Sequence, residues 1–225
     1  MRNYLLLLLS LGTMAIQAQA PVEMGFLPEF TLGYQFNDQW KLNAQLESMQ
    51  RGWRRTQEGL AGDYDYVRTD LTLVANYRIR PLVSAGAGYL LRFSDGELIH
   101  RTLQQIALVQ RLPHGRIGHR WRTDQTYQTA ATTRYRLRYR FSWETALRGQ
   151  RVDDHEFYLI TSWELVGSKQ AGDYGLENRL TGGLGYNINN EQQLEFGLDH
   201  RWDRLLENTS RHRIWWTIGY FIDLN

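Results

Sequence analysis

Apolar and polar residues alternate along most of this chain, most clearly in the segment 134–143, Arg-Tyr-Arg-Leu-Arg-Tyr-Arg-Phe-Ser-Trp. A period of two places successive side chains on opposite faces of a β-strand. One face of this strand therefore carries arginines, and the other carries bulky apolar groups. In a soluble sandwich the apolar face would form the core, whereas in a membrane barrel it would contact lipid and the arginines would line the lumen.

The same period recurs along the chain and predicts an all-β fold without helices. Strands are expected near 27–36, 40–50, 64–80, 82–94, 98–112, 116–128, 134–146, 156–166, 177–188, 193–203 and 212–224. Most reach the length of a tilted transmembrane strand, about 9–11 residues, and exceed the usual soluble strand of about 5–6. We therefore expect a transmembrane antiparallel β-barrel. Because single-chain bacterial barrels have an even number of strands, we expect 10 or 12 rather than the eleven segments recognised.

Connections of two lengths alternate between these segments. Short turns are expected at 37–39, 80–81, 113–115 and 189–191, and longer polar links at 51–63, 94–97, 129–133, 167–176 and 204–211, with 147–155 as an exception on the short-turn side. This alternation is typical of outer-membrane barrels, whose short turns are periplasmic and whose longer loops are extracellular. Aromatic residues gather at strand ends on both sides, as two interfacial girdles would require.

The first twenty residues have the features of a secretory signal peptide. A cationic start at Arg2 precedes an apolar run over 4–16, and Ala18-Gln19-Ala20 forms a small-residue cleavage site. We expect cleavage after Ala20, which leaves one domain over 21–225 in a Gram-negative outer membrane. The alternative is an N-terminal core segment or membrane anchor.

Composition limits the partners of this domain. Without the signal peptide, 25 basic residues face 24 acidic ones, so the net charge of +1 argues against binding to nucleic acid. All basic residues except Lys41 and Lys169 are arginines, which suit crowded bidentate pairing with carboxylates. Cysteine is absent, so disulfides are excluded.

The end of the chain resembles the signal that the outer-membrane barrel assembly machinery recognises, through Thr217, Gly219, Ile222 and Leu224. The segments 134–140, 156–159, 163–165, 177–186 and 194–198 resemble an uncharacterised family of bacterial outer-membrane barrels, porin-like and known only as a domain of unknown function. The resemblance implies a transmembrane barrel in contact with outer-membrane lipid. It implies no established activity, so no functional residue is carried over from it.

If the polar faces point inward, the lumen carries many charges, which we expect to include Arg120, Arg122, Arg134, Arg136, Arg138, Arg140, Glu144, Glu156, Glu164, Glu177 and Arg179. A fully paired network would plug the lumen and leave a structural or envelope-interaction role. A positive wall would instead make a narrow pore for small anionic solutes. The two hypotheses differ in whether each of Arg134–Arg140 is matched by a carboxylate.

An enzymatic role needs a nucleophile and a base. Ser210, His212 and Asn208 are weak candidates for a lipid hydrolase, because residues two apart on a strand point the same way. Ser94 with His100 is a second pair. No flanking glycine pattern supports the first set, so we expect ordinary polar residues and no enzyme. No His, Asp or Glu spacing indicates a metal, and no cofactor is expected.

Overall fold

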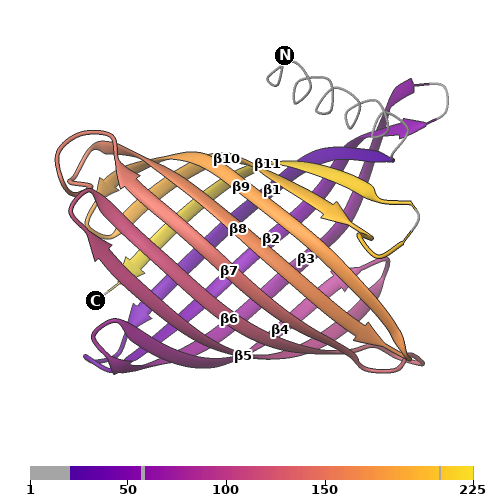
Figure 1. Cartoon of the computed structure of the whole chain (residues 1–225), viewed down its shortest axis with the longest axis horizontal. Coiled ribbons are helices and arrows are strands. Elements are labelled where there is room, and N and C mark those ends of the chain that lie inside the picture. Colours follow the sequence, from indigo (N-terminus) through magenta and orange to yellow (C-terminus); the bar gives the residue numbers. More distant parts are fainter. Residues whose placement is uncertain (1–20, 57–58, 208, 225) are drawn as a thin grey trace, which may run out of the picture.

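The computed structural model describes residues 21–56, 59–207 and 209–224, which form one closed β-barrel (Figure 1). The expected signal peptide lies outside the described residues. The strands are β1 (Val22–Gln35), β2 (Trp40–Thr56), β3 (Gly59–Arg80), β4 (Val83–Ser94), β5 (Glu97–Leu112), β6 (Gly115–Tyr127), β7 (Arg134–Ala146), β8 (Glu156–Gln170), β9 (Asp173–Asn189), β10 (Gln192–Asp203) and β11 (Arg211–Leu224). The described residues contain no helix that is long and apolar enough to cross a membrane.

The expected count of 10 or 12 strands is wrong, because the described residues form a closed barrel of eleven. Neighbouring strands pair antiparallel in chain order, so an odd number leaves the first and last strands running in the same direction. β1 and β11 close the barrel as a parallel pair, in register from Val22 opposite His212 to Tyr34 opposite Leu224. The segment expected at 27–36 is thus a full strand, β1, which begins five residues earlier, at Val22.

A proline interrupts one side of β1 without breaking the barrel. Pro28 is opposite Ile218 of β11, while the pairing of β1 with β2 skips from Phe26 to Glu29. Proline has no N–H to donate, so a gap in one ladder is the expected consequence.

The barrel has a C-terminal rim, where β1 and β11 end, and an N-terminal rim, where both begin (left and right in Figure 1). At the C-terminal rim, Asn37 Oδ1 accepts hydrogen bonds from the backbone N–H groups of Gln39 and Trp40, both at 2.9 Å. Asn189 Oδ1 does the same for Glu191 and Gln192. Such side-chain caps stabilise tight turns locally.

Two of the longer links expected at the N-terminal rim are mostly strand. β2 and β3 extend through most of 51–63 as a hairpin that projects beyond the neighbouring strands (Figure 1). β8 and β9 meet at a two-residue turn, where Ala171 and Gly172 have φ of 50° and 96°. Positive φ at both central residues is typical of a tight hairpin turn that matches strand twist. The contrast between short turns and long loops is therefore weaker than predicted.

The outer surface of the barrel is apolar and its interior is polar. On β7, Tyr135 and Leu137 are 57% and 63% exposed, whereas Arg138 is only 9% exposed. Exposed aromatic residues include Phe36 and Trp40 at the C-terminal rim and Tyr64 and Tyr127 towards the other. This distribution is the reverse of a soluble sandwich, because the apolar faces cover no core.

Aromatic rings that lie over glycines tighten the interior. A Cβ added at Gly185 would overlap the ring of Tyr158, its direct partner on β8. A Cβ added at Gly25 would press on Trp215 of β11, which packs with Leu27 and Met49 in the main apolar cluster of the interior. Glycine at both positions leaves space for a ring against the neighbouring strand.

Candidate functional site

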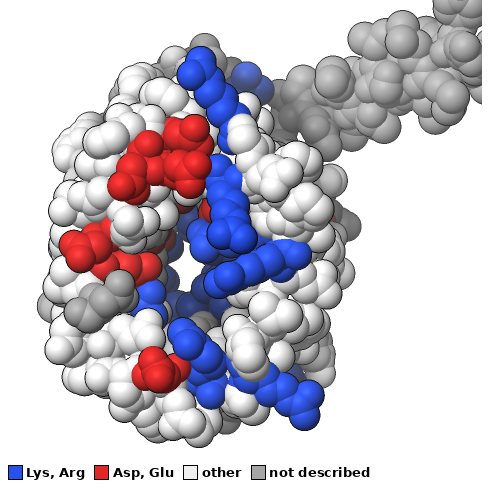
Figure 2. Space-filling model, turned by 90° about the vertical axis from the view of Figure 1, so that its left-hand side faces the viewer, with Lys and Arg blue, Asp and Glu red and all other residues white. Residues whose placement is uncertain are grey.

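The barrel encloses a cavity of about 1360 Å³ to which every strand contributes. Its lining extends from Lys41 and Asp223 near the C-terminal rim to Thr132 and Asp173 near the N-terminal rim. Figure 2 shows the opening at the C-terminal rim, with Asp and Glu gathered on one side and Lys and Arg on the other. The cavity is therefore a charged channel-shaped space with lining residues at both ends.

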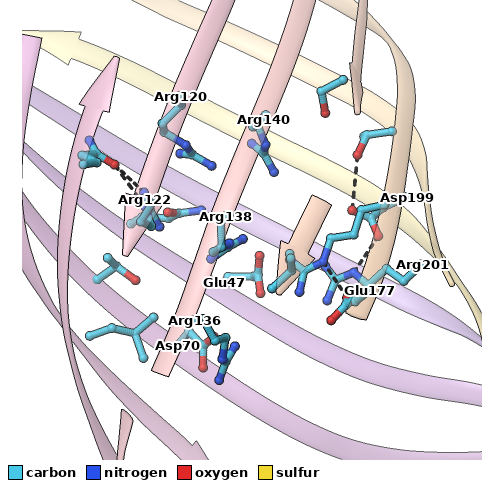
Figure 3. Close-up of a pocket in the computed structure, with 18 of the residues that line it drawn as sticks. Glu47, Asp70, Arg120, Arg122, Arg136, Arg138, Arg140, Glu177, Asp199 and Arg201 are labelled. Atoms are coloured by element: carbon cyan, nitrogen blue, oxygen red, sulfur yellow. Dashed lines mark hydrogen bonds and ion pairs between the residues drawn. The ribbon is translucent and has the colours of Figure 1, made fainter. Parts of the chain in front are cut away.

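Arginines of β6 and β7 form one wall of this cavity. Arg134, Arg136, Arg138 and Arg140 of β7 all line it, as their period of two requires. On β6, Arg122 is opposite Arg138 and Arg120 is opposite Arg140, so cations lie side by side across the two strands (Figure 3). Like charges placed directly opposite each other destabilise a strand pair unless anions intervene.

Glu164 of β8 is the main anion beside this wall. Its carboxylate is 1% exposed and lies 2.7 Å from Arg138, 3.3 Å from Arg120, 3.4 Å from Arg140 and 3.3 Å from Arg179. One negative charge thus contacts four guanidinium groups, which leaves an excess of positive charge around it. Arg138 has a second partner in Asp124, at 3.5 Å.

Four arginines of the lining have no carboxylate of the described residues within 4 Å. Arg122 donates two hydrogen bonds to Gln105 Oε1, and the shorter is 2.7 Å long. Arg134 donates one to Gln170 Oε1, also 2.7 Å long. Arg101 and Arg136 both donate to the Thr126 hydroxyl. Along β7, carboxylates therefore contact Arg138 and Arg140 but not Arg134 and Arg136.

The other expected carboxylates lie away from these four arginines. Glu144 pairs with Arg116 at 2.6 Å, and Glu177 pairs with Arg179 at 2.6 Å. Glu156 accepts a hydrogen bond from the backbone N–H of Asp153, in the link between β7 and β8. Of the expected lumen charges, Arg120, Arg138, Arg140 and Arg179 therefore meet at Glu164, whereas Glu144 and Glu156 lie near the C-terminal rim.

Sequence patterns did not reveal several residues of the lining, of which Arg92 and Arg101 are the most important. Both lie on the lumen face of their strands, but Leu90 and Leu103 are buried on the same faces. Inward leucines hide the polar period of β4 and β5. Only the pairing of Arg92 with Asp70, 2.6 Å apart across the β3–β4 ladder, shows that this arginine points inward.

The candidate catalytic residues do not form a nucleophile–base pair in the described part of the chain. His212 Nδ1 lies 3.0 Å from His200 Nε2, the two rings stack, and no hydrogen bond joins His212 to Ser210. Asn208 lies outside the described residues. Ser94 donates to the carbonyl of Val67, while His100 contacts the Tyr89 hydroxyl.

Two further expectations concern the absence of a metal site and the position of the terminal pattern on β11. Among residues 21–224, apart from the undescribed positions, no three His, Asp or Glu side chains are grouped to hold a metal ion. On β11, Thr217 and Gly219 line the cavity, while Ile222 and Leu224 fall on the opposite parity. The terminal pattern therefore contributes to both faces of the closing strand.

Together these features define a class of protein: a closed β-barrel with an apolar exterior and an arginine-rich lumen. The family described as "Protein of unknown function (DUF2490)" matches residues 24–212, and the chain belongs to this family. Neither a curated protein nor a solved structure matches the chain.

Proposed function

We propose that this protein is an outer-membrane β-barrel that lets small anionic solutes pass through its lumen. The observation that carries the proposal is a cavity lined from rim to rim in which Arg101, Arg122, Arg134 and Arg136 have no carboxylate partner among the residues that the structure describes. Fixed positive charges along a narrow passage attract anions and repel cations.

The exterior supports a membrane location. Large apolar side chains are exposed around the barrel, including Leu137, Trp143 and Leu180 at 63%, 42% and 58%. Extensive exposed apolar surface is uncommon in monomeric soluble proteins and is expected where lipid replaces water. The signal peptide expected over 1–20 and the terminal pattern of β11, both read from the sequence, favour the same compartment, with lipid and the assembly machinery as proposed partners.

Conductance in a planar bilayer tests this function. Refolded protein, with folding checked by heat-modifiable gel mobility, should give discrete current steps whose reversal potential in a KCl gradient is displaced towards that of chloride. Silence at all voltages would overturn the pore and favour a structural barrel whose lumen does not conduct. Cation preference would overturn the anion selectivity.

A pair of variants separates lumen charge from total charge. Arg122→Gln removes a cavity-lining cation that has no carboxylate partner, and it should move the reversal potential towards zero. Arg151→Gln removes an exposed cation from the link between β7 and β8 and serves as the matched control. An equal effect of both variants would show that selectivity does not arise from the lumen wall.

A further inference from the structure

Two guanidinium groups converge on one neutral oxygen in the wall of the cavity. Arg101 Nε of β5 donates to Thr126 Oγ1 at 2.9 Å, and an Nη of Arg136 on β7 donates to the same oxygen at 3.5 Å. Thr126 lies on β6 between them and is 8% exposed. A hydroxyl has no charge to offset two cations, and no carboxylate of the described residues lies within 4 Å of either guanidinium, although Asp124 is opposite Arg136 in the β6–β7 ladder.

The surroundings of Arg101 show the same lack of a paired anion. Arg101 is 3% exposed, and one of its Nη atoms is buried without a hydrogen-bond partner among the described residues. Arg101 lies opposite Thr126 across the β5–β6 ladder, and no carboxylate of the described residues lies within 4 Å of its guanidinium. A buried guanidinium donor without a partner is costly, and an oxygen of a bound anion would satisfy it.

The neighbouring carboxylates contact other arginines of the lining. Asp70 contacts Arg92 at 2.6 Å and Arg68 at 3.3 Å. Asp124, the direct cross-strand partner of Arg136, lies 3.5 Å from Arg138, and its two buried carboxylate oxygens have no hydrogen-bond partner among the described residues. The local excess of positive charge therefore remains after these ion pairs are counted.

We propose that Arg101 and Arg136 form a binding site for a tetrahedral oxyanion, a phosphate or a phosphate monoester, in the wall of the lumen. Guanidinium forks match the oxygens of phosphate in a bidentate manner, and one anion can bridge two forks. Both residues line the cavity, and Arg136 is the more exposed of the two, so an anion would approach the pair from the passage on the side of Arg136. This proposal rests on the proposed function, because it specifies phosphate and its monoesters as the anionic solutes that bind in the lumen.

Isothermal titration calorimetry of the folded protein in detergent, at constant ionic strength in chloride, tests the site without a membrane. Inorganic phosphate should bind with one site per chain. Arg136→Gln should weaken its binding by about tenfold or more, because hydrogen bonds to a charged group are lost. Arg136→Lys, which keeps the charge but loses the fork, should give an intermediate affinity. Glycerol 3-phosphate and sulfate, titrated in parallel, distinguish an ester from a free anion as the preferred ligand.

Arg122→Gln is the matched control, because Arg122 lines the same cavity without a carboxylate partner but contacts Gln105 instead of Thr126. It should leave phosphate affinity within about twofold. Equal weakening by Arg122→Gln and Arg136→Gln would overturn the site in favour of diffuse lumen charge, and so would the absence of phosphate binding in the unaltered protein. Phosphate binding by a protein that is silent in bilayers would overturn the pore but keep the site.

Discussion

At the scale of single residues, the interior depends on how one carboxylate offsets several cations. Glu164 is almost completely buried and contacts Arg120, Arg138, Arg140 and Arg179. The attraction in such a cluster offsets the loss of hydration only while both signs of charge are present. Its removal would leave buried cations facing one another, which makes Glu164 the most sensitive charge of the lumen.

Glu164→Gln should therefore destabilise the barrel by about 3 kcal/mol, since breaking a buried ion pair leaves its partners uncompensated. The measurement is the free energy of unfolding in urea, in lipid vesicles. Glu177→Gln, at a carboxylate that contacts only two arginines among the described residues, should cost less. Equal costs would show that water in the lumen screens the four-arginine cluster.

Gly185→Ala should destabilise the barrel by about 1–3 kcal/mol, the usual cost of overpacking. The added methyl group would overlap the Tyr158 ring, whose hydroxyl donates to Glu195 at 2.8 Å. Gly182→Ala on the same strand is the control, because a Cβ there meets nothing within 4 Å. Urea unfolding compares the two, and a neutral Gly185→Ala would contradict the tight packing of ring on glycine.

At the scale of elements, the decisive feature is the parallel pair of β1 and β11. Adjacent strands of an up-and-down barrel alternate in direction, so only parallel closure allows eleven. The rings of Phe30 and Tyr220, direct partners across this pair, are 6.1 Å apart between centroids. The pair places the start of β1 at the rim opposite the C-terminus (Figure 1).

Cysteines can test this register, because the chain has none of its own. A Phe30→Cys/Tyr220→Cys double variant should form an intramolecular disulfide on oxidation, since direct partners on neighbouring strands lie within disulfide range. The readout is mass spectrometry of the linked peptides.

Phe30→Cys/Trp216→Cys is the off-register control. Residue 216 is four positions along β11 from residue 220, about 13 Å at the rise of a strand. Crosslinking of this control in preference to the Tyr220 pair would contradict the parallel register.

At the scale of the whole molecule, polarity is inverted relative to a water-soluble fold. Side chains such as Leu137 and Leu180 point outward, while Asp124, Glu164 and Arg201 are nearly completely buried. Apolar exposure is favourable in lipid and unfavourable in water. The proposed membrane location thus explains both surfaces at once.

Leu180→Arg should lower the stability of the barrel in lipid vesicles by about 2–4 kcal/mol, the cost of a cation on the lipid-facing side near mid-membrane, because this exposed leucine lies in the middle of β9. Tyr174→Arg, at a similarly exposed residue beside the turn at the N-terminal rim, should cost about 0–1 kcal/mol. Urea unfolding in vesicles measures both. A Leu180→Arg protein of unchanged stability would indicate that water surrounds this face.

Much of the fold follows from local pattern. Alternation located all eleven strands, and the parity of 134–140 placed its arginines towards the interior. The expected links at 51–63 and 167–176 were wrong, because polar residues can continue a hairpin when both faces meet solvent or charge. The predicted number of strands was also wrong, because an even number follows only if the first and last strands pair antiparallel, and here they pair parallel.

The sequence by itself determined the strands, the faces of β7 and the arginine-rich character of the interior, because side-chain period is a local property of the backbone. Tertiary structure decided the parallel closure and the partners of each charge. Arg101, opposite Thr126 and near Arg136, has its significance only through pairing across three strands. Charge balance in a lumen is a sum over strands distant in sequence, so no single segment contains it.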